Sequence, residues 1–73
     1  MQKTTMPDRG FWRRIASGSV TLDGNVLGLY VVETDSDGAV LDYYPLVGEL
    51  PFTEWVAEPV ALVTDADGKV RVK

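Results

Sequence analysis

Three Asp-Gly dipeptides divide this 73-residue chain into short β-rich runs, and they constrain its fold more than any other feature. They lie at Asp23-Gly24, Asp37-Gly38 and Asp67-Gly68. Asp-Gly between apolar runs favours tight hairpins, because these turns need a positive φ, which glycine adopts without strain. The spacing predicts strands over residues 11–22, 26–34, 39–47, 58–65 and 69–73. We therefore expect an all-β protein, namely a five-stranded antiparallel meander curled into a partly open barrel or half-sandwich.

Two of these turns belong to a repeated pentapeptide, Thr-Asp-x-Asp-Gly, at residues 34–38 and 64–68. Its acids suggest a calcium loop of the EF-hand type. With Gly38 as the sixth residue of such a loop, the twelfth is Tyr44, which cannot supply the bidentate carboxylate that the loop needs. A type I turn followed by a left-handed glycine explains the same residues, because Asp favours the first position of such turns. We therefore expect two hairpin turns, with a weak calcium site in either loop as the alternative.

The expected strands differ in burial. Residues 26–33 are apolar at both odd and even positions, which predicts a central strand covered on both faces or one inside a small closed barrel. Residues 69–73 alternate two valines with three basic residues, and this pattern favours an edge strand. In the first strand the apolar positions change parity between Ile15 and Val20. A β-bulge or sharp coil at Gly18 would return both side chains to one face.

The segment "VGELPFTEW", residues 47–55, is the one stretch without a strand pattern. Pro51 has no N–H to give to a sheet, but it suits the first turn of a helix. We therefore expect one short helical turn, of the 3₁₀ type, across residues 51–55. Such a turn would carry Phe52 and Trp55 over an open end of the sheet, where their rings would add to a small core.

The chain contains no cysteine and no histidine. Disulfides and thiolate metal sites are therefore excluded, and the commonest metal ligand and general base at neutral pH are missing. Ser17 and Ser19 have no histidine to activate them, and so short a chain has little room for a deep cleft. We expect no catalytic residues, no metal site and no cofactor, and hence no enzyme. Because a domain of this size buries only about 60% of its surface, association with a second copy is the expected source of further burial.

Charge is separated along the chain. No lysine or arginine occurs between Ile15 and Gly68, whereas ten of the eleven acidic residues lie there. One interpretation is that acids occupy turns while bases protect edge strands. The other is a basic surface where the two ends of the chain meet, suited to an anionic partner or to the acidic body of a second copy. This surface would comprise Arg13, Arg14, Lys69 and Arg71. The acidic body disfavours nucleic acid as a partner.

Residues 1–10 are polar and predict a flexible N-terminal arm, and residues 11–73 predict a single small β domain. No apolar run approaches the length of a membrane span, and the first residues lack the apolar stretch of a signal peptide. We therefore expect a cytoplasmic protein with no membrane partner.

Aromatic residues supply the rest of the candidate interaction surface, which comprises Trp12, Tyr44, Phe52 and Trp55. Neighbouring Tyr43 and Tyr44 point to opposite faces of one strand, so one is expected in the core and the other exposed or at an interface. The sequence favours a non-catalytic interaction or structural module that self-associates as a homo-oligomer. The alternative is a small module that binds a saccharide or a peptide through exposed aromatic rings.

In the run "RRIASGSVTLDGNVLGLYVVETDSDGAVLDYYPL" the order strand, Asp-Gly, strand, Asp-Gly, strand, Pro-Leu resembles the β-composite subdomain that precedes the catalytic barrel of metal-dependent amidohydrolases. In its "YYPL" and "ELPFTEW" segments the chain also resembles a family of small β-rich proteins of gut bacteria. Together the two resemblances span Arg13 to Trp55. They imply a β fold and no activity, because the barrel and every metal-binding histidine of amidohydrolases are absent from this sequence.

Overall fold

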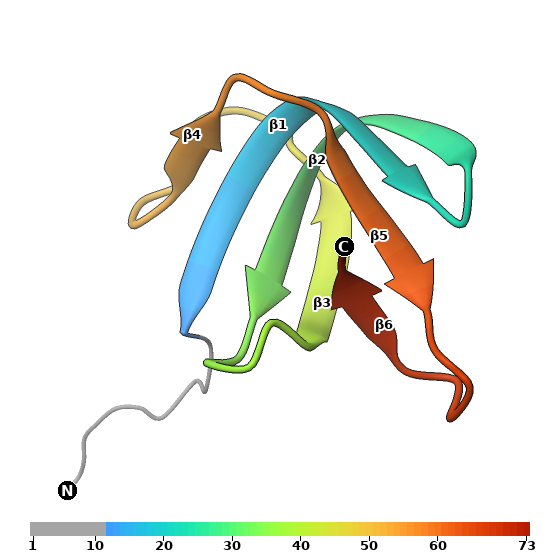
Figure 1. Cartoon of the computed structure of the whole chain (residues 1–73). Coiled ribbons are helices and arrows are strands. Elements are labelled where there is room, and N and C mark those ends of the chain that lie inside the picture. Colours follow the sequence, from blue (N-terminus) through green and yellow to red (C-terminus); the bar gives the residue numbers. More distant parts are fainter. Residues whose placement is uncertain (1–11) are drawn as a thin grey trace, which may run out of the picture.

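The computed structural model describes residues 12–73, which form one mixed β-sheet of six strands (Figure 1). The strands are β1 (Arg13–Leu22), β2 (Asn25–Thr34), β3 (Val40–Pro45), β4 (Glu54–Val56), β5 (Val60–Thr64) and β6 (Val70–Val72). Their order across the sheet is β3-β2-β1-β5-β6, and β4 pairs with β1 beside β5. The all-β prediction is therefore confirmed, whereas the predicted arm over residues 1–10 lies outside the described residues.

The prediction of a five-stranded antiparallel meander is wrong in its later half. The pairs β1–β2, β2–β3 and β5–β6 are antiparallel, but β4 and β5 both run parallel to β1. Parallel pairing needs a crossover instead of a tight turn. The connection of residues 46–53 provides it, because it carries the chain from the end of β3 to the other edge of β1. In Figure 1, β4 lies beside the first half of β1, away from β2.

The predicted bulge near Gly18 is confirmed. Ser17 pairs with Tyr30 and Val20 pairs with Gly28, so two residues of β1 face one residue of β2. The extra residue returns Val20 to the face that carries Ile15, and both side chains belong to the hydrophobic core.

The bulge also divides the second edge of β1 between two short strands. β4 pairs with residues 15–17 of β1, and β5 pairs with residues 20–22. Between them, the Ser17 hydroxyl donates to the Glu58 carbonyl at 2.9 Å. This bond ties the chain between β4 and β5 to β1, and Ser17 is almost completely buried.

The two Thr-Asp-x-Asp-Gly segments form matching hairpin turns, as predicted. In the first, Asp35 Oδ1 accepts hydrogen bonds from the amides of Asp37 and Ala39, both at 2.9 Å. In the second, Asp65 Oδ1 accepts from the equivalent amides, two and four residues on, at 2.9 and 3.0 Å. The glycine of each loop has a positive φ, 85° in the first and 82° in the second. In both turns, the Oδ1 atom of the first aspartate is therefore used as an acceptor within the turn itself.

The core lies inside the curled sheet. Its buried members are Ile15, Val20, Val32, Val60 and Leu62. The sheet curls until β6 meets the start of β3, where the Val72 amide donates to the Gly38 carbonyl at 3.1 Å and Arg71 forms a single bridge with Ala39. β6 is nevertheless the last strand of the sheet, which agrees with the edge position predicted for residues 69–73.

The predicted helical turn over residues 51–55 is wrong. Pro51 and Phe52 form a turn, and the chain is already extended as β4 from Glu54. Because side chains alternate along a strand, Trp55 points to the face opposite the core, and Phe52 lies in the turn before the strand. Both rings are exposed, so neither supplies the core burial that the sequence suggested. None of the described residues belongs to a helix with the length and apolar character needed to cross a membrane.

Candidate functional site

The face of the sheet opposite the core carries a row of side chains across four strands, which we call the outer face. The pairing register sets Trp55 of β4 beside Ala16 of β1, Ala16 beside Val31 of β2, and Val31 beside Tyr44 of β3. Directly paired residues project from the same face of a sheet. Val31 is completely buried there and Ala16 almost so, so this face is covered over its centre.

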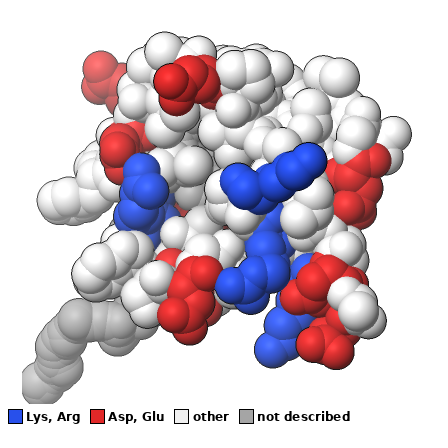
Figure 2. All heavy atoms as spheres, viewed as in Figure 1, with Lys and Arg blue, Asp and Glu red and all other residues white. Residues whose placement is uncertain are grey.

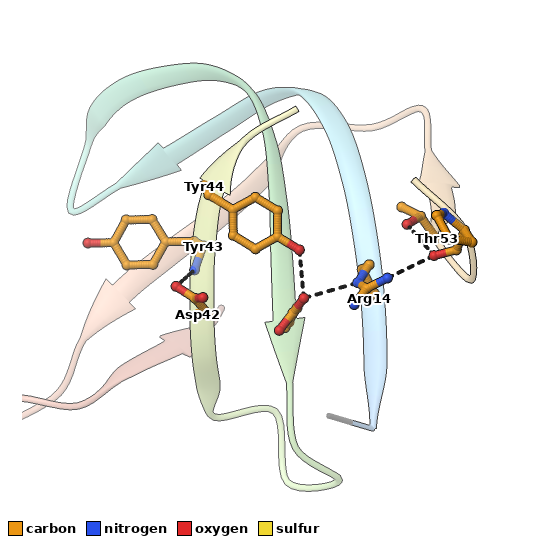
Figure 3. Close-up of polar contacts among 7 residues, drawn as sticks. Arg14, Asp42, Tyr43, Tyr44 and Thr53 are labelled. Carbon is orange, nitrogen blue, oxygen red and sulfur yellow. Dashed lines mark hydrogen bonds and ion pairs between the residues drawn. The ribbon is translucent and has the colours of Figure 1, made fainter. Parts of the chain in front are cut away.

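A second row on the outer face is charged. Glu33 pairs with Arg14 on one side, and its Oε2 accepts from Arg14 Nε at 3.0 Å and from the Tyr44 hydroxyl at 2.6 Å. Figure 3 shows these contacts running from Tyr44 across to Arg14. Partial burial, and then the hydrogen bond and the negative charge of Glu33, raise the pKa of Tyr44 to about 12. The hydroxyl therefore stays protonated at neutral pH and remains a donor to Glu33.

Arg14 also holds the connection between β3 and β4 against this face. Its Nη1 donates to the Pro51 carbonyl at 2.8 Å, and the Thr53 hydroxyl donates to the same carbonyl at 3.2 Å. At the other end of the connection, the Leu46 amide donates to the Leu29 carbonyl at 3.2 Å. The segment of residues 46–53 is thus fixed at both ends over the outer face.

The connection and the sheet enclose a pocket of about 600 Å³, which we call the outer groove. Ala16 forms part of its lining, Trp55 another part, and residues between Leu46 and Thr53 the remainder. Its lining is mainly apolar, and Glu49 is the ionisable side chain within it. Such a surface can hold an apolar group and place one carboxylate beside it, but it lacks a nucleophile paired with a base.

Large apolar side chains beside the outer groove are exposed to solvent. Val47 and Phe52 are each 87% exposed, and Trp55 is 60% exposed. Phe52 also has a φ of 57°, in the left-handed region that bulky L-residues rarely adopt. The connection therefore presents apolar residues to solvent, although it is anchored to the sheet.

The structure brings together one half of the residues predicted for an interaction surface. Arg14, Tyr44, Phe52 and Trp55 all lie on the outer face or on the connection that covers it. Tyr43 points the other way and packs its ring against Tyr30 in the core, with the ring centres 6.4 Å apart. The expected opposition of the two neighbouring tyrosines is confirmed, although Tyr44 is half-buried and not fully exposed.

The other predicted residues lie elsewhere. Trp12 and Arg13 line a smaller pocket of about 250 Å³ at the start of β1, and Arg13 forms an exposed ion pair with Glu54 at 2.8 Å. Lys69 follows the turn of residues 64–68, and Arg71 of β6 donates to the Asp37 carbonyl at 2.9 Å. Figure 2 shows the basic side chains in separate groups with acidic ones between and around them, so they do not form one basic surface in this view.

Sequence reasoning missed several residues that build the outer groove. Glu33 joins Arg14 to Tyr44, and Leu46 and Leu50 line the groove, but none of them was predicted as a site residue. Leu46 and Leu50 belong to the connection of residues 46–53, which contains no Asp-Gly dipeptide. The absence of this hairpin signal was the available indication of a long crossover. Glu33 gave no signal, because its partners come from other strands.

Within residues 12–73, no group of three or more acidic side chains is placed to hold a metal ion. Comparisons with protein-family models, with curated proteins and with solved structures found no match to this chain.

Proposed function

We propose that this protein is a non-catalytic interaction module that self-associates through the outer groove and the apolar side chains beside it. The observation that carries the proposal is Phe52, whose ring is exposed while its backbone is left-handed. That backbone conformation costs an L-residue roughly 1–2 kcal/mol. An exposed ring gains little burial within a single chain to offset this cost. Backbone strain clusters at functional sites, so we attribute this strained and exposed residue to a contact outside the single chain.

The exposed area sets the strength expected of such an association. Phe52 and Trp55 together leave on the order of 300 Å² of ring surface in water, since a full aromatic side chain covers about 150–250 Å². Complete burial of that area would contribute about 7 kcal/mol. Association costs about 4–15 kcal/mol in lost freedom of motion. We therefore expect weak, concentration-dependent association and not a permanent oligomer.

The outer groove also supports a second candidate function, the binding of a small saccharide or peptide. Its volume of about 600 Å³ lies within the usual range for small-ligand sites, about 300–1,000 Å³. Trp55 would supply an aromatic wall and Glu49 a hydrogen-bond acceptor. A panel of saccharides and peptides followed by tryptophan fluorescence distinguishes this candidate. A ligand bound in the groove would change the emission of Trp55, one of the two tryptophans, without changing the oligomeric state of the protein.

Phe52→Gly tests the leading proposal. Glycine adopts the left-handed conformation without strain, so its substitution keeps or raises the free energy of unfolding by up to about 1 kcal/mol. The same change removes the ring from the proposed contact. Sedimentation velocity over a concentration series should therefore show association for the wild type and a shift towards the monomer for Phe52→Gly. Val26→Thr is the matched control, because Val26 is exposed on β2 next to the first turn and not in the connection.

Two results would contradict the proposal. The wild type could sediment as a monomer of 8.0 kDa at every concentration. Alternatively, Phe52→Gly could associate as strongly as the wild type, in which case the ring has no part in the contact.

A further inference from the structure

We propose that the pocket of about 250 Å³ at the start of β1, which we call the end pocket, binds a monosaccharide-sized ring that carries several hydroxyl groups. The end pocket and the outer groove share no lining residue. The inference therefore adds a second site to the protein and does not depend on the proposed self-association.

The hydroxyl of Thr34 is the group that calls for a ligand. Thr34 lines the end pocket and is only 5% exposed, and its hydroxyl makes no hydrogen bond to any residue that the structure describes. The matching residue of the second Thr-Asp-x-Asp-Gly segment, Thr64, is exposed and donates its hydroxyl to Asp23 Oδ2 at 2.7 Å. Buried polar groups nearly always have a hydrogen-bond partner. Since the described part of the chain supplies none for Thr34, we expect the partner to come from a molecule in the pocket.

The pairing register places the Thr34 side chain on the face that bounds the end pocket. Thr34 pairs with Arg13, so the two side chains project from the same face of the sheet. Ile15 lies two residues further along β1, on the same face, and belongs to the core. Ile15 and Thr34 are the buried part of the lining, whereas Trp12 is 68% exposed. The pocket therefore reaches from an exposed aromatic ring to a buried hydroxyl.

The polar groups of the lining include both donors and acceptors. Arg13 can only donate, and its bonds to Glu54 use Nε and Nη2, which leaves Nη1 for a ligand. Asp35 accepts two turn amides through Oδ1, which leaves Oδ2 as an acceptor. Ser36 adds an exposed hydroxyl that can donate and accept. A ligand that fits this lining must itself donate and accept, as hydroxyl groups do, and the opposite charges of Arg13 and Asp35 favour a neutral one.

The volume and the aromatic ring of the end pocket set the size and shape of the ligand. An apolar cavity of about 150 Å³ holds one benzene ring, so about 250 Å³ leaves room for a six-membered ring with its hydroxyl groups. The indole of Trp12 offers a flat face against which the C–H groups of a sugar ring can pack. The Trp12 amide donates to the Thr34 carbonyl at 2.6 Å, and the Val72 amide donates to the Gly38 carbonyl at 3.1 Å. These bonds fix the walls of the pocket before a ligand binds.

An NMR titration of the isotope-labelled protein with D-glucose, D-galactose and D-mannose tests the inference. At least one of these sugars should shift the amide signals of residues 34–38 and the indole signal of Trp12. The dissociation constant should be on the order of 1–10 mM, because so small a ligand makes few contacts. The signals of residues 46–56, around the outer groove, should not move.

Three variants identify the groups that bind. Thr34→Val keeps the shape of the side chain but removes the hydroxyl, so it should fold normally and raise the dissociation constant about tenfold. Thr64→Val is the matched control, because it removes the equivalent hydroxyl of the second turn, outside the pocket, and it should bind like the wild type. Trp12→Ala removes an exposed ring and should also weaken binding about tenfold.

Any of three results overturns the inference. If none of the three sugars shifts the signals of the end pocket, water alone serves the Thr34 hydroxyl. If the shifts are confined to residues 46–56, the sugar binds in the outer groove. If Thr34→Val binds as tightly as the wild type, its hydroxyl has no part in the site. The proposed self-association stands or falls separately, by sedimentation.

Discussion

The hydroxyl of Tyr44 offers a quantitative test of the outer-face geometry. It donates to Glu33 Oε2 at 2.6 Å, and its pKa is raised from an ordinary value of 10.0 to about 12. Hydrogen bonds to charged groups stabilise proteins by about 1.5–3 kcal/mol. Because the ring is only half-buried, we expect Tyr44→Phe to lower the free energy of unfolding at neutral pH by about 1–2 kcal/mol.

The pH dependence follows from the direction of the pKa shift. A group whose pKa is higher in the folded protein than in the unfolded chain adds stability that is fully present below the unfolded value. That stability is lost as the pH rises from the unfolded value towards the folded one. For Tyr44 the window runs from pH 10.0 to about 12. The full shift corresponds to at most about 2.7 kcal/mol, and solvent screening reduces the expected loss to about 1–2 kcal/mol.

The assay is urea unfolding of the wild type and of Tyr44→Phe at a series of pH values from about 8 to about 11. The comparison of the two proteins removes every contribution that they share and leaves that of the Tyr44 hydroxyl. The difference in unfolding free energy should be largest near pH 8 and should shrink as the pH passes about 10. A difference that stays constant across the series, or one that is absent at pH 8, would refute the contact between Tyr44 and Glu33.

Two further predictions concern the fold. Leu62→Ala removes a completely buried core side chain and should lower the unfolding free energy by about 2–5 kcal/mol in chemical denaturation, whereas Leu41→Ala at an exposed position should change it by less than about 1 kcal/mol. Asp35→Ala and Asp65→Ala each remove an acceptor of two turn amides and should each cost about 1–2 kcal/mol in thermal unfolding. The loss should be larger for Asp35, because its turn also holds β6, and equal losses would contradict that role.

The hairpins of the fold were predictable because their signals are local. Each Asp-Gly dipeptide specifies a turn between strands that pair directly, and the change of parity between Ile15 and Val20 specifies a bulge within one strand. These features need no knowledge of distant residues. Their hydrogen bonds and positive φ values confirm the prediction at every Asp-Gly turn.

The path of the chain from β3 to β5 depended on a contact that the sequence does not display. Pro51 suits either a helical turn or an ordinary turn before a strand. The chain forms the ordinary turn because residues 54–56 pair with the edge of β1. That edge was left open by β2 and could accept β4 as a parallel partner. Once β4 is extended, Trp55 must point to the outer face. The expectation of a buried Trp55 therefore failed for the same reason as the expected helix.

The candidate site was predictable only as a list of residue types. Aromatic rings and arginines were expected at an interaction surface, and four of them do meet on the outer face. Sequence could not show that Arg13 and Arg14 would be bound by Glu54 and Glu33, because those partners are more than 18 residues away.

The most direct measurement of the central claim is a dilution series of the isotope-labelled protein by NMR. If the outer groove forms the contact, the amide signals of residues 46–56 should move with protein concentration, and those of the first hairpin turn, Asp23 and Gly24, should not. A spectrum that is independent of concentration, or one in which only the turn at residues 23–24 responds, would contradict self-association through this surface.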